Sequence, residues 1–118
     1  MLYVVNYLPE EMSVLFNQPV TVGMAEPEAF EVRQILEANE WQSLINDKKV
    51  AETLSLLLGM KIPTATKKPI TFKYSDKLIV FLLKQIELLP LKGIEPKNII
   101  SYYKFVYVNF RPLSEVLI

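Results

Sequence analysis

The residues best placed to do chemistry are Asp47, Lys48 and Lys49, which precede an apolar run beginning at Val50. Aspartate is favoured just before a helix, because its carboxylate accepts hydrogen bonds from the free N–H groups of the first turn. Lys48 and Lys49 would lie in that turn, where the helix dipole makes cations slightly unfavourable. This local conflict indicates either an anion-binding site or an ordinary pair of solvated lysines.

The sequence contains no histidine and no cysteine. Without His the chain lacks the usual proton carrier near pH 7 and the commonest metal ligand, and a Ser-His-Asp triad is impossible. Without Cys there are no disulfides, thiolate nucleophiles or Cys-bound metals. Glycine-rich phosphate loops, metalloprotease motifs and calcium-binding loops are also absent from the sequence. We therefore predict neither a metal nor a cofactor.

The charge balance gives no global attraction toward nucleic acid, because 13 basic residues offset 13 acidic ones. Aromatic residues recur in the predicted strands, where they fit either a packed core or a platform for stacking single-stranded bases. The neighbouring basic residues form no dense stripe, which favours the core and argues against a duplex nucleic-acid partner. The longest apolar run, Leu78 to Leu83, is too short to span a membrane, and we expect a cytoplasmic protein without membrane contact.

The predicted elements form one α/β domain over residues 1–118, with 51% hydrophobic residues available for its core. Asp47 and Gly59 bracket one helix, since glycine commonly ends a helix in the left-handed conformation. Pro27 is expected at the first position of an earlier helix, whose core-facing stripe includes Phe30 and Leu36. Five segments have the composition of strands: residues 2–5, 19–22, 70–74, 78–83 and 105–110.

Local signals also predict how three of these strands are placed. The tight turn at Ser75-Asp76 favours a β-hairpin of residues 70–74 and 78–83. The strand at 19–22 is short and begins with proline, which favours a place near the sheet edge. Asn6, just after the first strand, is either a turn residue or a polar group that lines a site.

Two stretches of the chain resemble the small proteins of crenarchaeal viruses called viral ring nucleases. They are the opening Met1–Asn6 and the block Val50–Gly59, and the likeness continues through Ile62-Pro63, the segment Ile70–Lys73, Asp76, Val80–Gln85 and Phe105–Phe110. The resemblance implies a homodimer with a mixed sheet of about five strands flanked by helices. It also implies an anti-CRISPR activity: these proteins bind cyclic tetra-adenylate, the messenger of type III CRISPR immunity, and cleave it without metal.

The resemblance assigns roles to particular positions of this chain. The family's Ile-Gly-His, which carries the general acid, falls on Ile45-Asn46-Asp47. The family's Lys-Gln-Arg, whose Arg contacts phosphate, falls on Lys84-Gln85-Ile86, and a further Arg falls near Lys67. The implied site therefore has Asp47 at the catalytic position, with ligand contacts from Asn6, Asn46, Lys48, Lys49, Lys67 and Gln85.

These replacements change the chemistry that the site could perform. A carboxyl group is almost fully ionised at neutral pH and makes a poor general acid, and a carboxylate at a helix N-terminus competes for the N–H groups that a phosphate would use. We therefore expect binding of cyclic tetra-adenylate or a similar anionic nucleotide, with cleavage lost or weakened. The alternative at this position is that Asp47 is only a helix cap and that the pocket has lost its function. One alternative is a non-enzymatic dimer that binds a host or viral protein, and another is a residual enzyme with Asp47 or Glu87 as the acid. A basic cleft favours the nucleotide, and an acidic or apolar cleft favours a protein partner.

Overall fold

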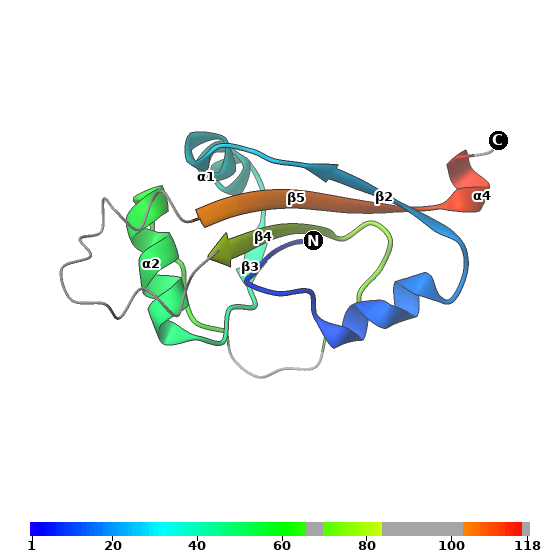
Figure 1. Cartoon of the computed structure of the whole chain (residues 1–118), viewed down its shortest axis with the longest axis horizontal. Helices are drawn as coiled ribbons and strands as arrows, with labels where there is room; N and C mark the ends of the chain where they lie inside the picture. The colour runs from blue at the N-terminus through cyan, green and yellow to red at the C-terminus, as the bar shows by residue number, and fades with distance from the viewer. Residues whose placement is uncertain (66–69, 84–102, 117–118) are drawn as a thin grey trace.

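Five strands form one mixed sheet in the order β2-β5-β4-β1-β3 (Figure 1). The computed structural model describes residues 1–65, 70–83 and 103–116. β1 runs parallel to both β3 and β4, whereas β5 runs antiparallel to β4 and β2. The predicted α/β class with a five-stranded mixed sheet is confirmed. The strands are β1 (Leu2–Val5), β2 (Val20–Ala25), β3 (Trp41–Ser43), β4 (Lys77–Leu83) and β5 (Tyr103–Pro112).

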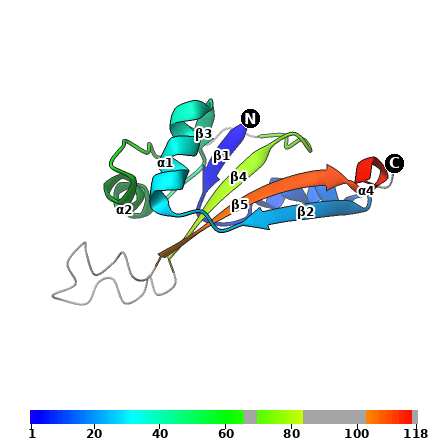
Figure 2. The same cartoon turned by 90° about the horizontal axis from the view of Figure 1, so that it is seen from above.

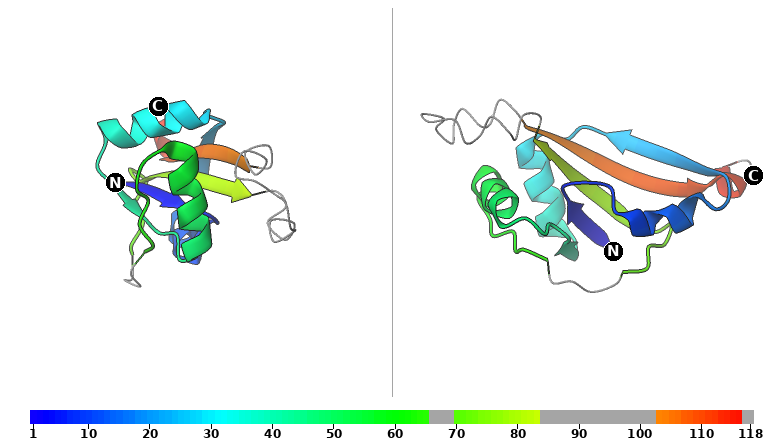
Figure 3. Two further views of the ribbon diagram at one scale, coloured as in Figure 1. Left: turned by 90° about the vertical axis from the view of Figure 1, so that its left-hand side faces the viewer. Right: turned by 60° about the horizontal axis from the view of Figure 1, so that its bottom comes forward.

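Helices lie against both faces of the sheet. Two α-helices, α1 (Ala29–Ala38) and α2 (Lys48–Leu58), cover one face (Figure 2). A 3-10 helix, η1 (Glu10–Phe16), packs on the opposite face, as the second panel of Figure 3 shows. A short helix, α4 (Leu113–Val116), follows β5. Because neighbouring residues of a strand point to opposite faces, each strand contributes to two separate cores.

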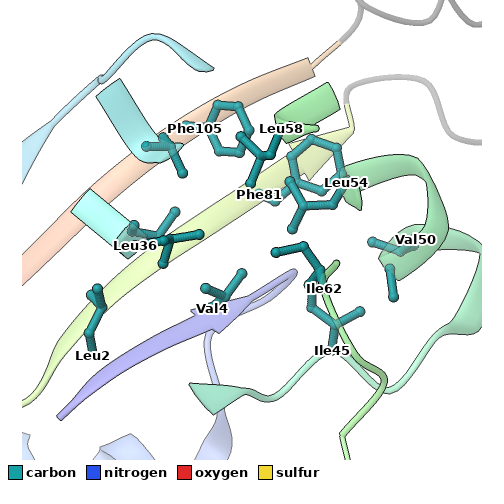
Figure 4. Close-up of a cluster of buried hydrophobic side chains, with 13 residues drawn as sticks. Leu2, Val4, Leu36, Ile45, Val50, Leu54, Leu58, Ile62, Phe81 and Phe105 are labelled. Atoms are coloured by element: carbon teal, nitrogen blue, oxygen red, sulfur yellow. The ribbon is translucent and has the colours of Figure 1, made fainter. Parts of the chain in front are cut away.

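The larger core lies between the sheet and the two α-helices (Figure 4). Leu54 of α2 and Leu36 of α1 face the sheet, where Phe81 and Phe105 stack with ring centroids 5.3 Å apart. Full burial of side chains of this size contributes roughly 1.5–3 kcal/mol each. The other buried members are Leu2, Val4, Val32, Ile45, Val50, Ala51, Leu58, Ile62 and Ile79.

A second core lies on the η1 face of the sheet. Met12 and Leu15 of η1 are buried there with the alternate residues of β1, β4 and β5. Tyr3 meets Phe72 edge to face, with ring centroids 5.3 Å apart. The Tyr74 hydroxyl donates a hydrogen bond to the Leu15 carbonyl at 2.9 Å, which ties the segment before β4 to η1. The strand aromatics thus serve as core residues, as the sequence predicted.

Residues 70–74 do not form the predicted hairpin strand. β4 already has a neighbour on each side, because β1 pairs with it in parallel and β5 in antiparallel register. The turn before β4 is present, with the Asp76 N–H donating to the Lys73 carbonyl at 3.0 Å, but Phe72 is buried in the second core from an irregular segment. The fifth strand is instead β3, which the sequence analysis did not identify.

The first α-helix begins later than predicted and turns a different side to the core. Glu28 is the N-cap, and its side chain forms a reciprocal capping box with Glu31, so Pro27 lies outside the helix. Val32 and Leu36, four residues apart, are buried, whereas Phe30 is 65% exposed. The predicted stripe was therefore wrong at Phe30, because two residues span a little more than half a helical turn and place Phe30 on the opposite side of the helix from Val32. The place of β2 at the sheet edge is confirmed.

Candidate functional site

Those predicted site residues that the structure describes follow the ends of β1 and β3 along the chain. The register pairs Val4 with Ser43, and the Leu44 N–H donates to the Val4 carbonyl at 2.8 Å just beyond the last pair. The two strands therefore leave the sheet at the same edge, with Asn6 following one and Asn46 the other. The carboxyl ends of parallel strands are where open α/β sheets commonly bind ligands.

The segment that follows α2 returns to this same edge. The Ala65 N–H donates to the Ile45 carbonyl at 2.8 Å, and Ile45 is completely buried in the larger core. The backbone on both sides of α2 is thereby fixed to one place. A rigid support of this kind is needed where side chains must hold a defined geometry toward a ligand.

The N-terminus of α2 is occupied by the Asp47 side chain. Its Oδ1 accepts hydrogen bonds from the backbone N–H groups of Lys49 at 2.9 Å and Val50 at 3.3 Å. The predicted N-cap is confirmed. Free N–H groups and the helix dipole make such an end a natural anion site, and here the chain's own carboxylate fills it.

The two lysines of the first helical turn are exposed to solvent, as is Asn46. Within the described ranges, Lys48 and Lys49 make no ion pair with an acidic side chain. Their ammonium groups are therefore accessible to an anionic ligand. Long flexible lysines bind phosphates as mobile point charges, which suits a site whose helix N–H groups are already engaged.

Asn6 differs from these residues because it is partly buried. Its Oδ1 atom is shielded from solvent and has no hydrogen-bond partner in the described part of the chain. Buried polar atoms are nearly always hydrogen-bonded, so an unpartnered acceptor indicates strain, water or a ligand. Asn6 also lies in a bend directly after β1, so both of its predicted roles, turn residue and site residue, fit its position.

The remaining implied contacts, Lys67 and Gln85, lie outside the described residues, and Ile86 and Glu87 do so as well. Their participation stays a prediction. In the described ranges, no cluster of three or more His, Cys, Asp or Glu side chains could hold a metal ion. Among the same residues, no helix is long and apolar enough to cross a membrane.

A feature that the sequence analysis missed is an apolar groove on the η1 face of the sheet. Its volume is about 680 Å³, and it lies between η1 and the strands β2, β5 and β4. Exposed apolar side chains line it, including Tyr7, Leu8, Phe16, Val22 and Met24. Residues 22 and 24 are two positions apart in β2, so their side chains point to the same face of the sheet. The sequence does not show that η1 covers only part of this face and leaves both residues exposed.

Comparison with known proteins finds a likeness among solved structures. No protein-family model matches the chain, and no curated protein matches it. Among solved structures, B116 of Sulfolobus turreted icosahedral virus is similar with a TM-score of 0.65 and 13% sequence identity, over 91% of this chain and 97% of the B116 chain. At such low identity the likeness is one of fold. The chain therefore shares the fold of a viral protein along nearly its whole length.

Proposed function

We propose that this chain is a viral or mobile-element protein related to the ring nucleases of crenarchaeal viruses. It acts in the host cytoplasm as a homodimer that binds cyclic tetra-adenylate, and its cleavage activity is lost or weakened. The resemblance of the sequence and the shared fold with B116 support this origin. The anti-CRISPR role would then be sequestration of the messenger. Binding lowers the free concentration of cyclic tetra-adenylate, as its cleavage would.

The observation that carries the proposal is the Asp47 carboxylate at the N-terminus of α2. It stands where the family resemblance places a general acid, and it accepts two backbone N–H hydrogen bonds. Carboxyl side chains in general are mostly ionised at neutral pH and then have no proton to give to a leaving 5′-oxygen. Protonation of the leaving group typically contributes 10²–10⁴-fold to a rate, so the expected defect in cleavage is large.

Binding would rely on side chains around that carboxylate. Lys48 and Lys49 are exposed beside it and supply positive charge for the phosphates. The Oδ1 of Asn6, which has no hydrogen-bond partner among the residues that the structure describes, is an acceptor that suits the N6 amino group of adenine or a ribose hydroxyl. Asn46, Lys67 and Gln85 complete the proposed contacts.

The test is to incubate the pure protein with labelled cyclic tetra-adenylate, measuring binding by gel shift and cleavage by chromatography. Tight binding without a linear product supports the proposal. Rapid conversion to a linear product would show that another group supplies the proton. If the protein neither binds cyclic tetra-adenylate nor converts it to a product, this nucleotide is excluded as the ligand.

Variants make this test specific to the site. Replacing Lys48 and Lys49 together by Ala should weaken binding at least about tenfold, as the loss of two charge contacts predicts. Lys67→Ala should weaken it as well. Lys77→Ala is the matched control, because Lys77 is exposed at the amino end of β4, opposite Leu2, and its loss should leave affinity unchanged.

A second candidate function is a non-enzymatic protein that binds a host or viral protein. The apolar groove beside η1 favours it, because an apolar cleft is suited to protein contacts and not to a charged nucleotide. In that case Met24→Glu, which places a charge in the groove, would abolish capture of the partner, and the Lys48 and Lys49 variants would not.

A further inference from the structure

An open cleft lies between β3 and the segment that follows α2. Its volume is about 570 Å³, within the range of sites that hold small organic ligands. Trp41 and Ser43 of β3 line one wall, and Lys61 and Thr64 line the other. None of the described residues proposed above to contact cyclic tetra-adenylate lines this cleft.

Both walls of the cleft are held in place by the larger core. Trp41 packs against this core, and Ile45 is completely buried in it. The opposite wall is anchored by Ile62, which belongs to the same core (Figure 4) and whose N–H donates to the Ser55 Oγ at 2.9 Å. The hydrogen bond from the Ala65 N–H to the Ile45 carbonyl joins the two walls at one end. The cleft is therefore formed before a ligand arrives, which lowers the cost of binding.

The backbone of β3 offers hydrogen-bonding groups on the side of the cleft. The Leu44 N–H donates to the Val4 carbonyl of β1, and alternate residues of a parallel strand direct their backbone groups to the same neighbour. The N–H and C=O groups of Trp41 and Ser43 therefore point away from β1, as the Ile45 carbonyl does. Among the described residues, β3 has no strand on that side. These donors and acceptors are thus left for a ligand.

The side chains of the cleft add an aromatic surface, a hydroxyl and one charge. Trp41 is only partly buried, so its indole combines a fixed position with surface for stacking. Ser43 is 4% exposed; its Oγ accepts the Ile45 N–H at 3.3 Å, and in the described part of the chain its own proton has no acceptor. Among the described residues that line the cleft, Lys61 alone is charged, and it is exposed.

We infer that this cleft binds a nucleoside monophosphate, at a site separate from the N-terminus of α2. The base stacks on Trp41, and its edge pairs with the outward backbone groups of β3. Adenine suits that edge because it carries a donor, the N6 amino group, beside an acceptor, N7. Lys61 supplies the point charge for the phosphate.

A compact ligand fits the cleft better than an extended peptide does. Peptides that add a strand to a sheet need a long free edge, whereas β3 has three residues and only Trp41 and Ser43 direct their backbone groups outward. The hydrogen bond between Ala65 and Ile45 also closes one end of the cleft. A single nucleotide needs no passage beyond that point.

The first test uses the fluorescence of Trp41. This residue is the only tryptophan of the chain, so its emission reports on the cleft directly. We expect AMP to quench it saturably, with a dissociation constant of about 1 mM or lower. Ribose 5-phosphate has no base to stack and should leave the emission unchanged. No saturable change with AMP, or an equal change with ribose 5-phosphate, would overturn the inference.

Variants then separate stacking from phosphate binding, with calorimetry as the readout and circular dichroism to check folding. Trp41→Ala should weaken AMP binding at least about fivefold, the low end of base stacking on an aromatic side chain, whereas Trp41→Phe keeps a ring and should lose less. If both variants bound AMP as the wild type does, the nucleotide would lie elsewhere and the inference would fail.

The role of Lys61 is tested by comparing AMP with adenosine. The wild type should bind AMP severalfold more tightly, and Lys61→Ala should abolish this preference, because the interaction energy of a pair is lost when either partner is removed. Lys77→Ala is the matched control, since Lys77 is also exposed and does not line the cleft. A preference that survives in Lys61→Ala would overturn the assignment of the phosphate. Failure of cyclic tetra-adenylate to bind would leave this cleft standing.

Discussion

The Asp47 carboxylate and the backbone N–H of Lys49 are joined by a 2.9 Å hydrogen bond at the start of α2. The helix end therefore carries its own anion. This arrangement stabilises the helix through capping and the helix dipole. It also places a negative charge where a phosphate would otherwise bind.

Removing the Asp47 cap should destabilise the protein. Asp47→Ala leaves the N–H groups of Lys49 and Val50 without their acceptor, and we expect a loss of about 1 kcal/mol in the free energy of unfolding. Urea denaturation followed by circular dichroism measures it. Asp47→Ser keeps an oxygen acceptor and should lose only a small part of this. Equal losses in both variants would contradict the capping argument.

Removing only the charge of Asp47 should increase nucleotide affinity. Asparagine caps a helix about as well as aspartate, so Asp47→Asn should keep the stability of α2 while relieving repulsion with the phosphates. We expect binding of cyclic tetra-adenylate to tighten severalfold at low salt, with a smaller gain at high salt because salt screens exposed charges. Titration at two ionic strengths tests this. An unchanged affinity would mean that the ligand lies elsewhere.

The sequence predicted those parts of the fold that depend on local signals. Asp47 and Gly59 bracket α2 as expected, because a cap carboxylate and a left-handed glycine act within one helical turn. The prediction of a hairpin strand at residues 70–74 was wrong because strand pairing depends on residues far away in the sequence. Its alternation is that of a strand, but both sides of β4 are occupied by strands distant in sequence.

For the candidate site, local signals in the sequence predicted the position of Asp47 at the start of α2, but not the elements around it. Asp47 could be placed because its role is local to one helix end. β3, which brings Asn46 beside the end of β1, is only three residues long and gives little periodic signal. The apolar groove could not be predicted, since the exposure of Met24 depends on how much of that face η1 covers.

Loss of the buried carboxylate of Asp76 should be strongly destabilising. Asp76 is 6% exposed; its Oδ1 lies 3.0 Å from the Met1 ammonium, and its Oδ2 accepts the Lys73 N–H at 2.8 Å. Asp76→Ala leaves both donors without a partner, and we expect a loss of about 1–3 kcal/mol in thermal or urea unfolding.

The control for Asp76 is an ion pair at the surface. Arg33 and Glu37 lie 2.6 Å apart, with their side chains 49% and 56% exposed. Exposed pairs one helical turn apart contribute about 0.3–0.5 kcal/mol, so Glu37→Gln should change stability little. If the two variants lost equal stability, burial would not be what makes Asp76 important.

Stability should fall at strongly alkaline pH because of Tyr3. Burial, and secondarily the negative charge of Asp76, raise the pKa of the Tyr3 hydroxyl above its ordinary value of 10.0. The folded state therefore favours the neutral phenol, and this contribution is complete below pH 10.0 and lost as the pH rises through the folded-state pKa. Urea unfolding across this range should show a steeper decline for the wild type than for Tyr3→Phe. Parallel declines would mean that other groups govern the alkaline limit.

Substitution of Gly59 should separate backbone strain from side-chain crowding at the end of α2. Gly59 has φ of +65°, and an added Cβ would lie 2.9 Å from Nη1 of Arg33, which donates to the Leu58 carbonyl at 3.2 Å. Gly59→Ala should cost about 1 kcal/mol, because alanine resists the left-handed conformation. Gly59→Asn adds the same Cβ but tolerates that conformation better, so it should lose less in thermal unfolding. If Asn destabilised as much as Ala, contact with Arg33 and not the backbone angle would explain why glycine is required there.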